Sequence, residues 1–241
     1  MNLVIDIGNT LLKYAVFEEK EIIYGGTSES IDEFSVESIF LRYSEIKNAI
    51  VSSVRIIPEN LIATIKSFCK LHLVSNKTKL PFVNLYKTPG TLGNDRIAGI
   101  SGAFSLYPKK NVLVIDAGTC ITTDFLHADG KYYGGTISPG IKMKLTALHT
   151  FTEKLPLVNL RDLKNDYGYD TESSIITGVI NGTVAEIEYT IDYYKKKYKE
   201  IIVLLCGGDA AFLAKRLKNS IFAVSELVLI GLNELLEYNE E

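Results

Sequence analysis

The stretch LVIDIGNT at residues 3–10 returns near the middle of the chain as LVIDAGTC at residues 113–120. In both copies an apolar run ends in an aspartate, and a glycine follows two residues later. The similarity extends over residues 3–26 and 113–135, which both close on a Gly-Gly pair when one residue is skipped in the second copy. The sequence therefore predicts a structural unit that occurs twice.

Each copy has the pattern of three short strands joined by tight turns. The predicted strands are residues 2–8, 12–18 and 21–26 in the first copy, and 112–117, 120–126 and 131–136 in the second. A glycine at the tip of a hairpin lets the backbone approach a phosphate, and an aspartate at a strand end can hold a cation beside it. Two such hairpins facing each other across a cleft would clamp a polyphosphate. The alternative is a duplication kept for folding alone, with Asp-x-Gly as ordinary turn chemistry.

The rest of the chain alternates helical and strand patterns. We expect a helix from Asn94, with Asn94 as its N-cap, a long helix over about 171–197 and a last helix over about 225–238. IIVLLCGG at 201–208 reads as a buried strand that ends in a glycine pair, which would suit the nucleoside end of a ligand. Residues 140–170 give no clear pattern.

Composition excludes several classes of protein. The 241 residues are 46% hydrophobic and 23% charged with a formal net charge of −3, and no apolar run is long enough to span a membrane. The three cysteines and three histidines are scattered, so we expect reduced thiols and no zinc site. Lysines 195–197 read as a solvated helix end rather than a nucleic-acid patch. Without a signal-peptide pattern, we expect a cytoplasmic protein that binds neither membrane nor nucleic acid.

Four motifs together resemble one family. DIGNT at 6–10, PGTLGNDR at 89–96, DAGTCITTD at 116–124 and GGTISPG at 134–140 look like those of a type III pantothenate kinase, in the acetate and sugar kinase/Hsp70/actin superfamily. LGNDR is the most specific of them, because it is not a general nucleotide signature.

The resemblance implies an α/β fold with two related lobes of the actin-like ATPase (ribonuclease H-like) type and a cleft between them. We expect an N-terminal lobe over 1–108, with the first phosphate hairpin and the pantothenate segment. A C-terminal lobe over 109–241 would hold the second hairpin and the adenosine segment, and its last helix could pack back on the first lobe.

The activity that the resemblance implies is ATP-dependent phosphorylation of pantothenate to 4′-phosphopantothenate, the first step of coenzyme A biosynthesis. It also implies Mg²⁺ with ATP, a monovalent cation (K⁺ or NH₄⁺) and a homodimer. Two alternatives stay open: another small-alcohol kinase of the same superfamily, and a non-enzymatic nucleotide-binding regulatory module.

Carried over residue by residue, the resemblance assigns three groups of side chains. The ATP-binding residues would be Asp6, Ile7, Gly8, Asn9, Thr10, Leu11, Leu12, Lys13 and Thr119. The substrate-binding residues would be Tyr86, Gly93, Asn94, Asp95, Arg96 and, from the partner subunit, Thr171. Asp95 would be the general base, and Asp116 would hold the monovalent cation.

Simple chemistry supports Asp95 and Arg96 independently. Phosphoryl transfer to an alcohol needs a carboxylate that accepts the hydroxyl proton and a cation that neutralises the transferring group. Both side chains fall at the start of a helix, where the dipole also favours a bound carboxylate such as that of pantothenate. The plain alternatives are a helix-terminus carboxylate at Asp95, a solvated strand lysine at Lys13, a half-buried aromatic at Tyr86 and an ordinary N-cap at Thr171.

Overall fold

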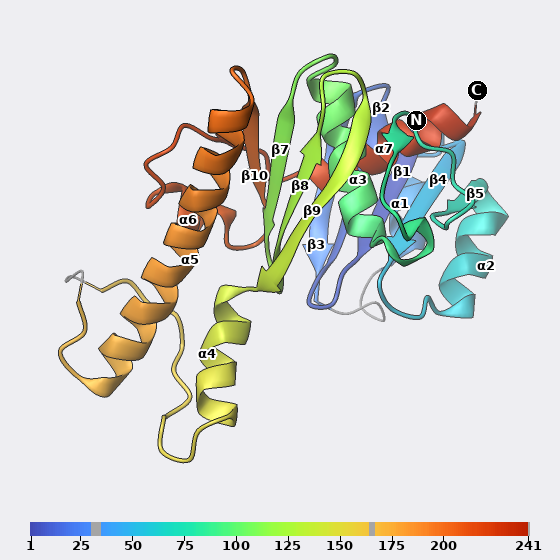
Figure 1. Ribbon diagram of the computed structural model, residues 1–241. Coiled ribbons are helices and arrows are strands. Elements are labelled where there is room, and N and C mark those ends of the chain that lie inside the picture. Colours follow the sequence, from blue (N-terminus) through green and yellow to red (C-terminus); the bar gives the residue numbers. More distant parts are fainter. Residues whose placement is uncertain (30–34, 164–166, 241) are drawn as a thin grey trace. The chain divides into compact units, whose positions relative to one another are not determined.

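The computed structural model describes residues 1–29, 35–163 and 167–240, and the chain forms two compact units (Figure 1). Unit 1 consists of residues 1–109, 126–133 and 226–241, and unit 2 of residues 110–125 and 134–225. The chain therefore passes between the units several times, and each unit is described by itself below.

Unit 1 is built on a five-stranded sheet in the order β3-β2-β1-β4-β5. Its strands are β1 (Asn2–Ile7), β2 (Leu12–Glu18), β3 (Glu21–Ser28), β4 (Asn48–Ser53) and β5 (Lys70–Leu73). Strand β1 lies antiparallel to β2 and parallel to β4. Its central residues 3–5 are fully buried, as the continuous apolar run predicts.

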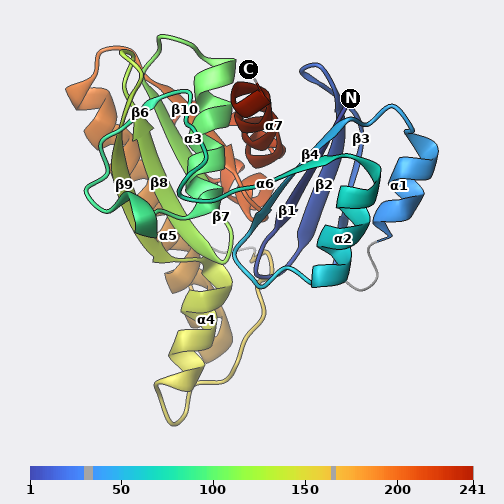
Figure 2. The same cartoon turned by 90° about the vertical axis from the view of Figure 1, so that its right-hand side faces the viewer.

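Helices cover both faces of this sheet (Figure 2). One face packs against α1 (Val36–Arg42) and α2 (Glu59–Phe68), whose buried side chains share a core with β1, β2 and β4. On the other side, α7 (Leu227–Glu240) contacts β1, β4 and β2, and it also packs along α3 (Asn94–Leu106). Unit 1 therefore draws its second helical layer from segments far apart in the sequence.

Two glycines let α3 and α7 approach backbone to backbone. A Cβ added to Gly231 would lie 1.7 Å from the carbonyl oxygen of Ala98, and one added to Gly102 would lie 2.5 Å from that of Leu227. No larger residue fits at either position without separating the helices.

Unit 2 carries the same sheet order a second time. The second sheet runs β11-β10-β7-β8-β9-β6. Read in reverse, its strands β9-β8-β7-β10-β11 correspond to β3-β2-β1-β4-β5 of the unit 1 sheet. The strands are β7 (Val112–Ala117), β8 (Cys120–Leu126), β9 (Lys131–Pro139), β10 (Ile202–Cys206) and β11 (Phe222–Ala223). Strand β10 is parallel to β7, as β4 is to β1. The additional β6 (Val83–Asn84) pairs with the first residues of β9, within unit 1.

The helices of unit 2 pack on this sheet around one core. They are α4 (Ile141–Thr150), α5 (Thr171–Lys197) and α6 (Ala210–Ala214). Buried residues of β7 and β10 share a cluster with apolar residues of all three helices. Figure 1 shows α4 lying beside the first half of α5, in agreement with their contacts.

Most predicted boundaries are confirmed, including the long helix over 171–197 and the strands at 112–117 and 120–126. One cap was wrong, because Gly93 occupies the N-cap of α3 and Asn94 is its first helical residue. The sequence patterns missed α1, β5, α4 and β11. Across the part of the chain that the structure describes, no helix is both long and apolar enough to cross a membrane.

Candidate active site

The first hairpin places Asp6 one residue before the end of β1. There it pairs with Lys13 on β2 and with Ser52 on β4. The four-residue loop to β2 is closed by a hydrogen bond from the Gly8 N–H to the Leu11 carbonyl at 3.0 Å. Residues 9–11 of this loop are exposed, so their backbone and side chains are available to a ligand.

Burial raises the pKa of Asp6 to about 6. Within that net shift the nearby Asp95 carboxylate also acts to raise the pKa, whereas the Ser52 hydroxyl and the Lys13 ammonium act to lower it. The Ser52 hydroxyl is buried, and of the two groups that lower this pKa it has the larger effect. A mostly buried carboxylate with such weak compensation is suited to a cation, which would remove the cost of its charge.

The second part of the unit 1 site is the start of α3. The Asp95 carboxylate folds back and accepts the Arg96 N–H at 2.8 Å. A Cβ on Gly93 would lie 2.4 Å from that same carboxylate oxygen, so glycine is needed there for Asp95 to take this position. The short helix η1 (Pro89–Thr91) precedes this turn.

Arg96 is buried, with 6% of its surface exposed, and its guanidinium carbon lies 5.6 Å from the centre of the Tyr86 ring. Tyr86 in turn stacks on Tyr132, with ring centres 6.3 Å apart, and its N–H donates to the Asn84 side chain at 2.9 Å. Tyr132 was not among the predicted site residues. It follows the second copy's turn in sequence, and only the pairing of β6 with β9 brings it to Tyr86.

In unit 2 the second hairpin repeats the first. Asp116 stands one residue before the end of β7 and pairs with Cys206 on β10. The two-residue loop to β8 is closed by a 2.9 Å hydrogen bond from the Gly118 N–H to the Cys120 carbonyl. Gly207 has a φ of +93°, and a Cβ there would lie 2.3 Å from an Asp116 carboxylate oxygen. The glycine thus leaves the space that this carboxylate occupies.

The GGTISPG segment contacts the second loop through its backbone. The Gly140 N–H donates to the Thr119 carbonyl at 3.1 Å. A Cβ on Gly140 would lie 2.1 Å from the Gly118 carbonyl oxygen, so the turn and the loop are in direct backbone contact. The predicted ATP contact Thr119 is therefore held by a segment that sequence reasoning had recognised only as part of a motif.

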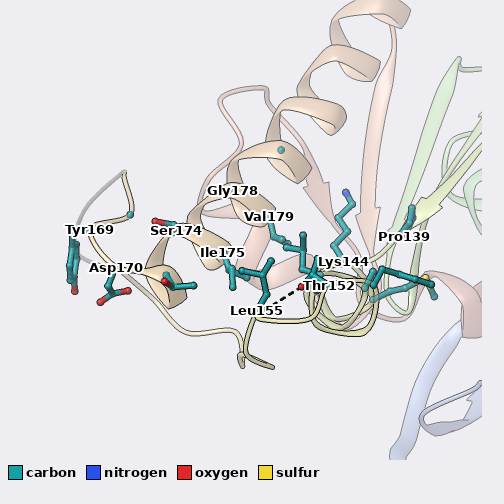
Figure 3. A pocket seen from close by; sticks show the side chains of 17 residues that line it. Pro139, Lys144, Thr152, Leu155, Tyr169, Asp170, Ser174, Ile175, Gly178 and Val179 are labelled. Atoms are coloured by element: carbon teal, nitrogen blue, oxygen red, sulfur yellow. Dashed lines mark hydrogen bonds between the residues drawn. The ribbon is translucent and has the colours of Figure 1, made fainter.

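Thr171 is the first residue of α5 and is exposed. The N-cap is Asp170, whose carboxylate accepts the Ser173 N–H at 2.7 Å in a capping box. These hydrogen bonds lower the pKa of Asp170. Thr171 therefore is not the N-cap, and it lines a groove between α4 and α5 instead. Figure 3 shows this groove with the neighbouring Asp170 and Ser174.

The structure thus groups the predicted residues unit by unit. In unit 1 it brings together Asp6, Lys13 and Asp95, and Arg96 of α3 lies over the ring of Tyr86. In unit 2, Asp116 and Thr119 share the second hairpin and Thr171 lies on the groove. Within residues 1–29, 35–163 and 167–240, no three His, Cys, Asp or Glu side chains form a metal-ligand cluster.

Comparison with known proteins identifies one family. The family model described as type III pantothenate kinase matches residues 2–193. A protein named type III pantothenate kinase from Christiangramia forsetii is 44% identical over 241 residues, covering 100% of this chain and 99% of its own. One of the same name from Bacteroides fragilis strain YCH46 is 44% identical over 243 residues, covering 99% and 98%.

Solved structures agree on the fold. A Campylobacter jejuni protein, provisionally described as a Baf family transcriptional activator, superposes with a TM-score of 0.60 at 20% identity, covering 99% of this chain and 98% of its own. A glucokinase from an Antarctic psychrotroph gives a TM-score of 0.51 at 14% identity, covering 98% of each chain. The predicted fold class, with two related lobes of the actin-like ATPase type, is confirmed. By its matched family model and its full-length relatives, the chain belongs to the type III pantothenate kinase family.

Proposed function

We propose that this chain is a pantothenate kinase, which transfers the γ-phosphoryl group of ATP to the 4′-hydroxyl of pantothenate at the entry to coenzyme A biosynthesis. The observation that carries the proposal is the start of α3 in a chain of this family, where Asp95 accepts the Arg96 N–H and the buried Arg96 side chain lies over the Tyr86 ring.

Asp95 is the proposed general base. Its carboxylate stands in the first turn of α3, where the helix dipole favours negative charge, and it is near the Asp6 carboxylate. In phosphoryl transfer the base accepts the proton of the attacking hydroxyl as the new P–O bond forms. Arg96, held against the Tyr86 ring, would bind the carboxylate of pantothenate or an oxygen of the transferring group.

Asp6 fits the metal that accompanies ATP. Magnesium bound to the phosphates would neutralise charge on the transferred group and keep most of its waters. Asp6 would accept hydrogen bonds from those waters, or bind the ion directly, as a mostly buried carboxylate in need of a counter-charge. The exposed loop over residues 8–11 and Lys13 would hold the phosphate oxygens.

Asp116 is the proposed ligand of a monovalent cation. A second carboxylate charge near the polyphosphate would repel it by about 4 kcal/mol for unit charges about 4 Å apart at an effective dielectric near 20. Potassium or ammonium would offset this repulsion. The test is a titration of K⁺ into Na⁺-only or Tris-only buffer, for the wild type and for Asp116→Asn. Equal wild-type rates with and without K⁺ would exclude the cation and leave a basic side chain as the partner of Asp116.

Two rival functions are separated by one assay. Another small-alcohol kinase would release ADP with glycerol or a sugar, and a regulatory module would bind nucleotide without turnover. Pantothenate, glycerol and sugars are tested one at a time in a coupled assay for ADP. We expect ADP release only with pantothenate. A faster rate with any other alcohol, or no turnover with any, would reject the proposed substrate.

We further propose that the enzyme is a homodimer whose subunits meet at the groove between α4 and α5. The groove has a volume of about 1440 Å³ and exposes apolar side chains, including Phe151 at 85% and Tyr169 at 68% exposure (Figure 3). Met143 also lines it and is 40% exposed. Surfaces of this kind are typical of subunit contacts. Thr171, on the rim of the groove, would then reach pantothenate bound mainly by the other chain.

Subunit mixing tests this arrangement directly. Thr171→Arg and Asp95→Asn each damage one half of a shared site, and each variant alone should be nearly inactive. In a mixed dimer one site keeps both residues, so random mixing should restore about a quarter of wild-type activity. If light scattering shows a monomer that is fully active at nanomolar concentration, or if mixing restores no activity, the shared site is excluded.

The cytosolic location remains a prediction.

A further inference from the structure

Glu186 on α5 joins three elements of unit 2 through its two carboxylate oxygens. One oxygen accepts a hydrogen bond from the Ser138 hydroxyl at the end of β9. The other accepts one from the Lys144 ammonium of α4 at 2.8 Å, and the same ammonium donates to the Thr183 hydroxyl of α5 at 3.0 Å. The Lys144 side chain is only 21% exposed and that of Glu186 36%, so the ion pair is largely sheltered from water.

The residues that follow Ser138 lie directly against the second phosphate loop. After Pro139, the Gly140 N–H donates to the Thr119 carbonyl at 3.1 Å, and Gly140 has no room for a side chain next to the Gly118 carbonyl. A displacement of the turn at Ser138 would therefore reach Gly118 and Thr119 through backbone contacts alone. Because these contacts join backbone atoms, a change of side-chain rotamer at Gly140 cannot absorb the shift.

Helix α4 is tied to the same network. It begins at Ile141, immediately after the Gly140 turn, and its first turns carry Lys144. In Figure 3 the Lys144 side chain extends along α5 and away from Leu155, so its stem lines the groove while its ammonium faces α5. Glu186 thus fixes both the strand that enters the turn and the helix that leaves it.

We propose that Glu186 is a positioning residue for nucleotide binding, which holds the Gly118–Thr119 loop through Ser138 and Lys144. The inference rests on the proposed kinase function, since Thr119 is expected to contact ATP. A loop that is fixed before ATP arrives loses less conformational freedom on binding, so the network should act on ATP rather than on pantothenate.

The experiment compares Glu186→Ala with the matched control Glu188→Ala. Glu188 stands on the same helix and accepts hydrogen bonds from Asn219 and from the Lys218 N–H, away from the phosphate loop. Both changes remove a hydrogen-bonded carboxylate from α5, so both should lower the melting temperature. Only Glu186→Ala should raise the KM for ATP, by about 10-fold or more, with the KM for pantothenate unchanged.

Two further measurements separate positioning from general damage. Hydrogen exchange of a peptide covering residues 116–121 should be faster in Glu186→Ala than in the wild type or Glu188→Ala. Glu186→Gln keeps groups that can bond to Ser138 and Lys144, so it should recover part of the loss in both readouts.

The proposal is overturned if Glu186→Ala changes the two KM values equally, or if residues 116–121 exchange at the wild-type rate in that variant. The exchange measurement needs no substrate. It therefore decides the positioning role separately, even if the wild-type protein does not phosphorylate pantothenate.

Discussion

The two hairpins of this chain share one plan and differ in how they are supported. Asp6 and Asp116 each stand one residue before the end of the central strand, and each pairs with the parallel neighbouring strand, at Ser52 and Cys206. The segment after each neighbouring strand also bonds to the end of the central strand in the same way. The Val54 N–H donates to the Ile7 carbonyl, and the Asp209 N–H donates to the Ala117 carbonyl. The duplication therefore includes the strand pairing and its exit, as well as the motif.

The differences lie in the loops and in what touches them. The first loop spans residues 8–11 and is largely exposed, whereas the second spans residues 118–119 and has Gly140 packed against it. The first copy leaves β4 through Val54, and the second leaves β10 through a Gly-Gly pair. The loop of the first copy is thus exposed, whereas the loop of the second copy is packed against another segment, although the strand order is the same in both.

The largest effect is expected from removing the proposed general base of unit 1. Asp95→Asn should lower kcat by about 10²- to 10⁴-fold, the usual contribution of a general base, while the affinity for ATP is retained. Glu59→Gln is the control, because Glu59 also opens a helix and is exposed. Steady-state kinetics and nucleotide titration give both quantities. Equal turnover of Asp95→Asn and wild type would reduce Asp95 to a carboxylate that only stabilises a helix end.

The next change tests the glycine that packs against Asp116 in unit 2. Gly207→Ala forces a side chain onto a φ of +93° and against Asp116, so the free energy of unfolding should fall by about 2–4 kcal/mol. Gly208→Ala is the neighbouring control, because a Cβ there meets nothing within 4 Å. Urea denaturation measures both. Similar losses for the two variants would show that the position of the glycine does not matter.

A third change acts on the buried charge of the first copy. Because the folded-state pKa of Asp6 is about 6, against 3.8 ordinarily, the wild type loses stability as pH rises through that window. Asp6→Asn should match the wild type below pH 3.8 and exceed its free energy of unfolding by about 2–3 kcal/mol above pH 6. Urea midpoints between pH 3 and pH 8 check this, without nucleotide.

The control for that experiment has the opposite sign. The pKa of Asp129 is lowered to about 2 by Lys131 and His127, so its contribution is present above pH 3.8 and is lost as pH falls. Asp129→Asn should therefore be less stable than the wild type near neutral pH. A destabilised Asp6→Asn at pH 8 would show that the Asp6 charge is already compensated in the free protein.

The smallest effect is expected at Ser52. Its buried hydroxyl forms no hydrogen bond of normal geometry, so Ser52→Ala should change the free energy of unfolding by no more than about 1 kcal/mol. Because the hydroxyl lowers the pKa of Asp6, the same variant should move the Asp6 titration upward. Carboxyl ¹³C chemical shifts followed over pH measure that titration. A large loss of stability would mean that Ser52 makes a hydrogen bond in solution.

The parts of this molecule that could be predicted from the sequence are those that are local or repeated. The strand pattern, the paired Asp-x-Gly turns and the long helix all follow from apolar periodicity and glycine positions within short windows. The contacts of Tyr132 with Tyr86, and of Gly140 with Thr119, could not be predicted, because each joins segments that only strand pairing brings together. Helix α4 was missed because its apolar side chains partly line a groove instead of the core.

The close contact of α3 with α7 has a consequence during synthesis of the chain. Helix α7 is needed to cover the unit 1 sheet, yet the ribosome makes it only after all of unit 2. Until then the face of β1, β2 and β4 that α7 covers is an exposed apolar surface on a growing polypeptide. Unit 2 can bury its core first, so the N-terminal segment should be the last to become resistant to protease and the first to need a chaperone.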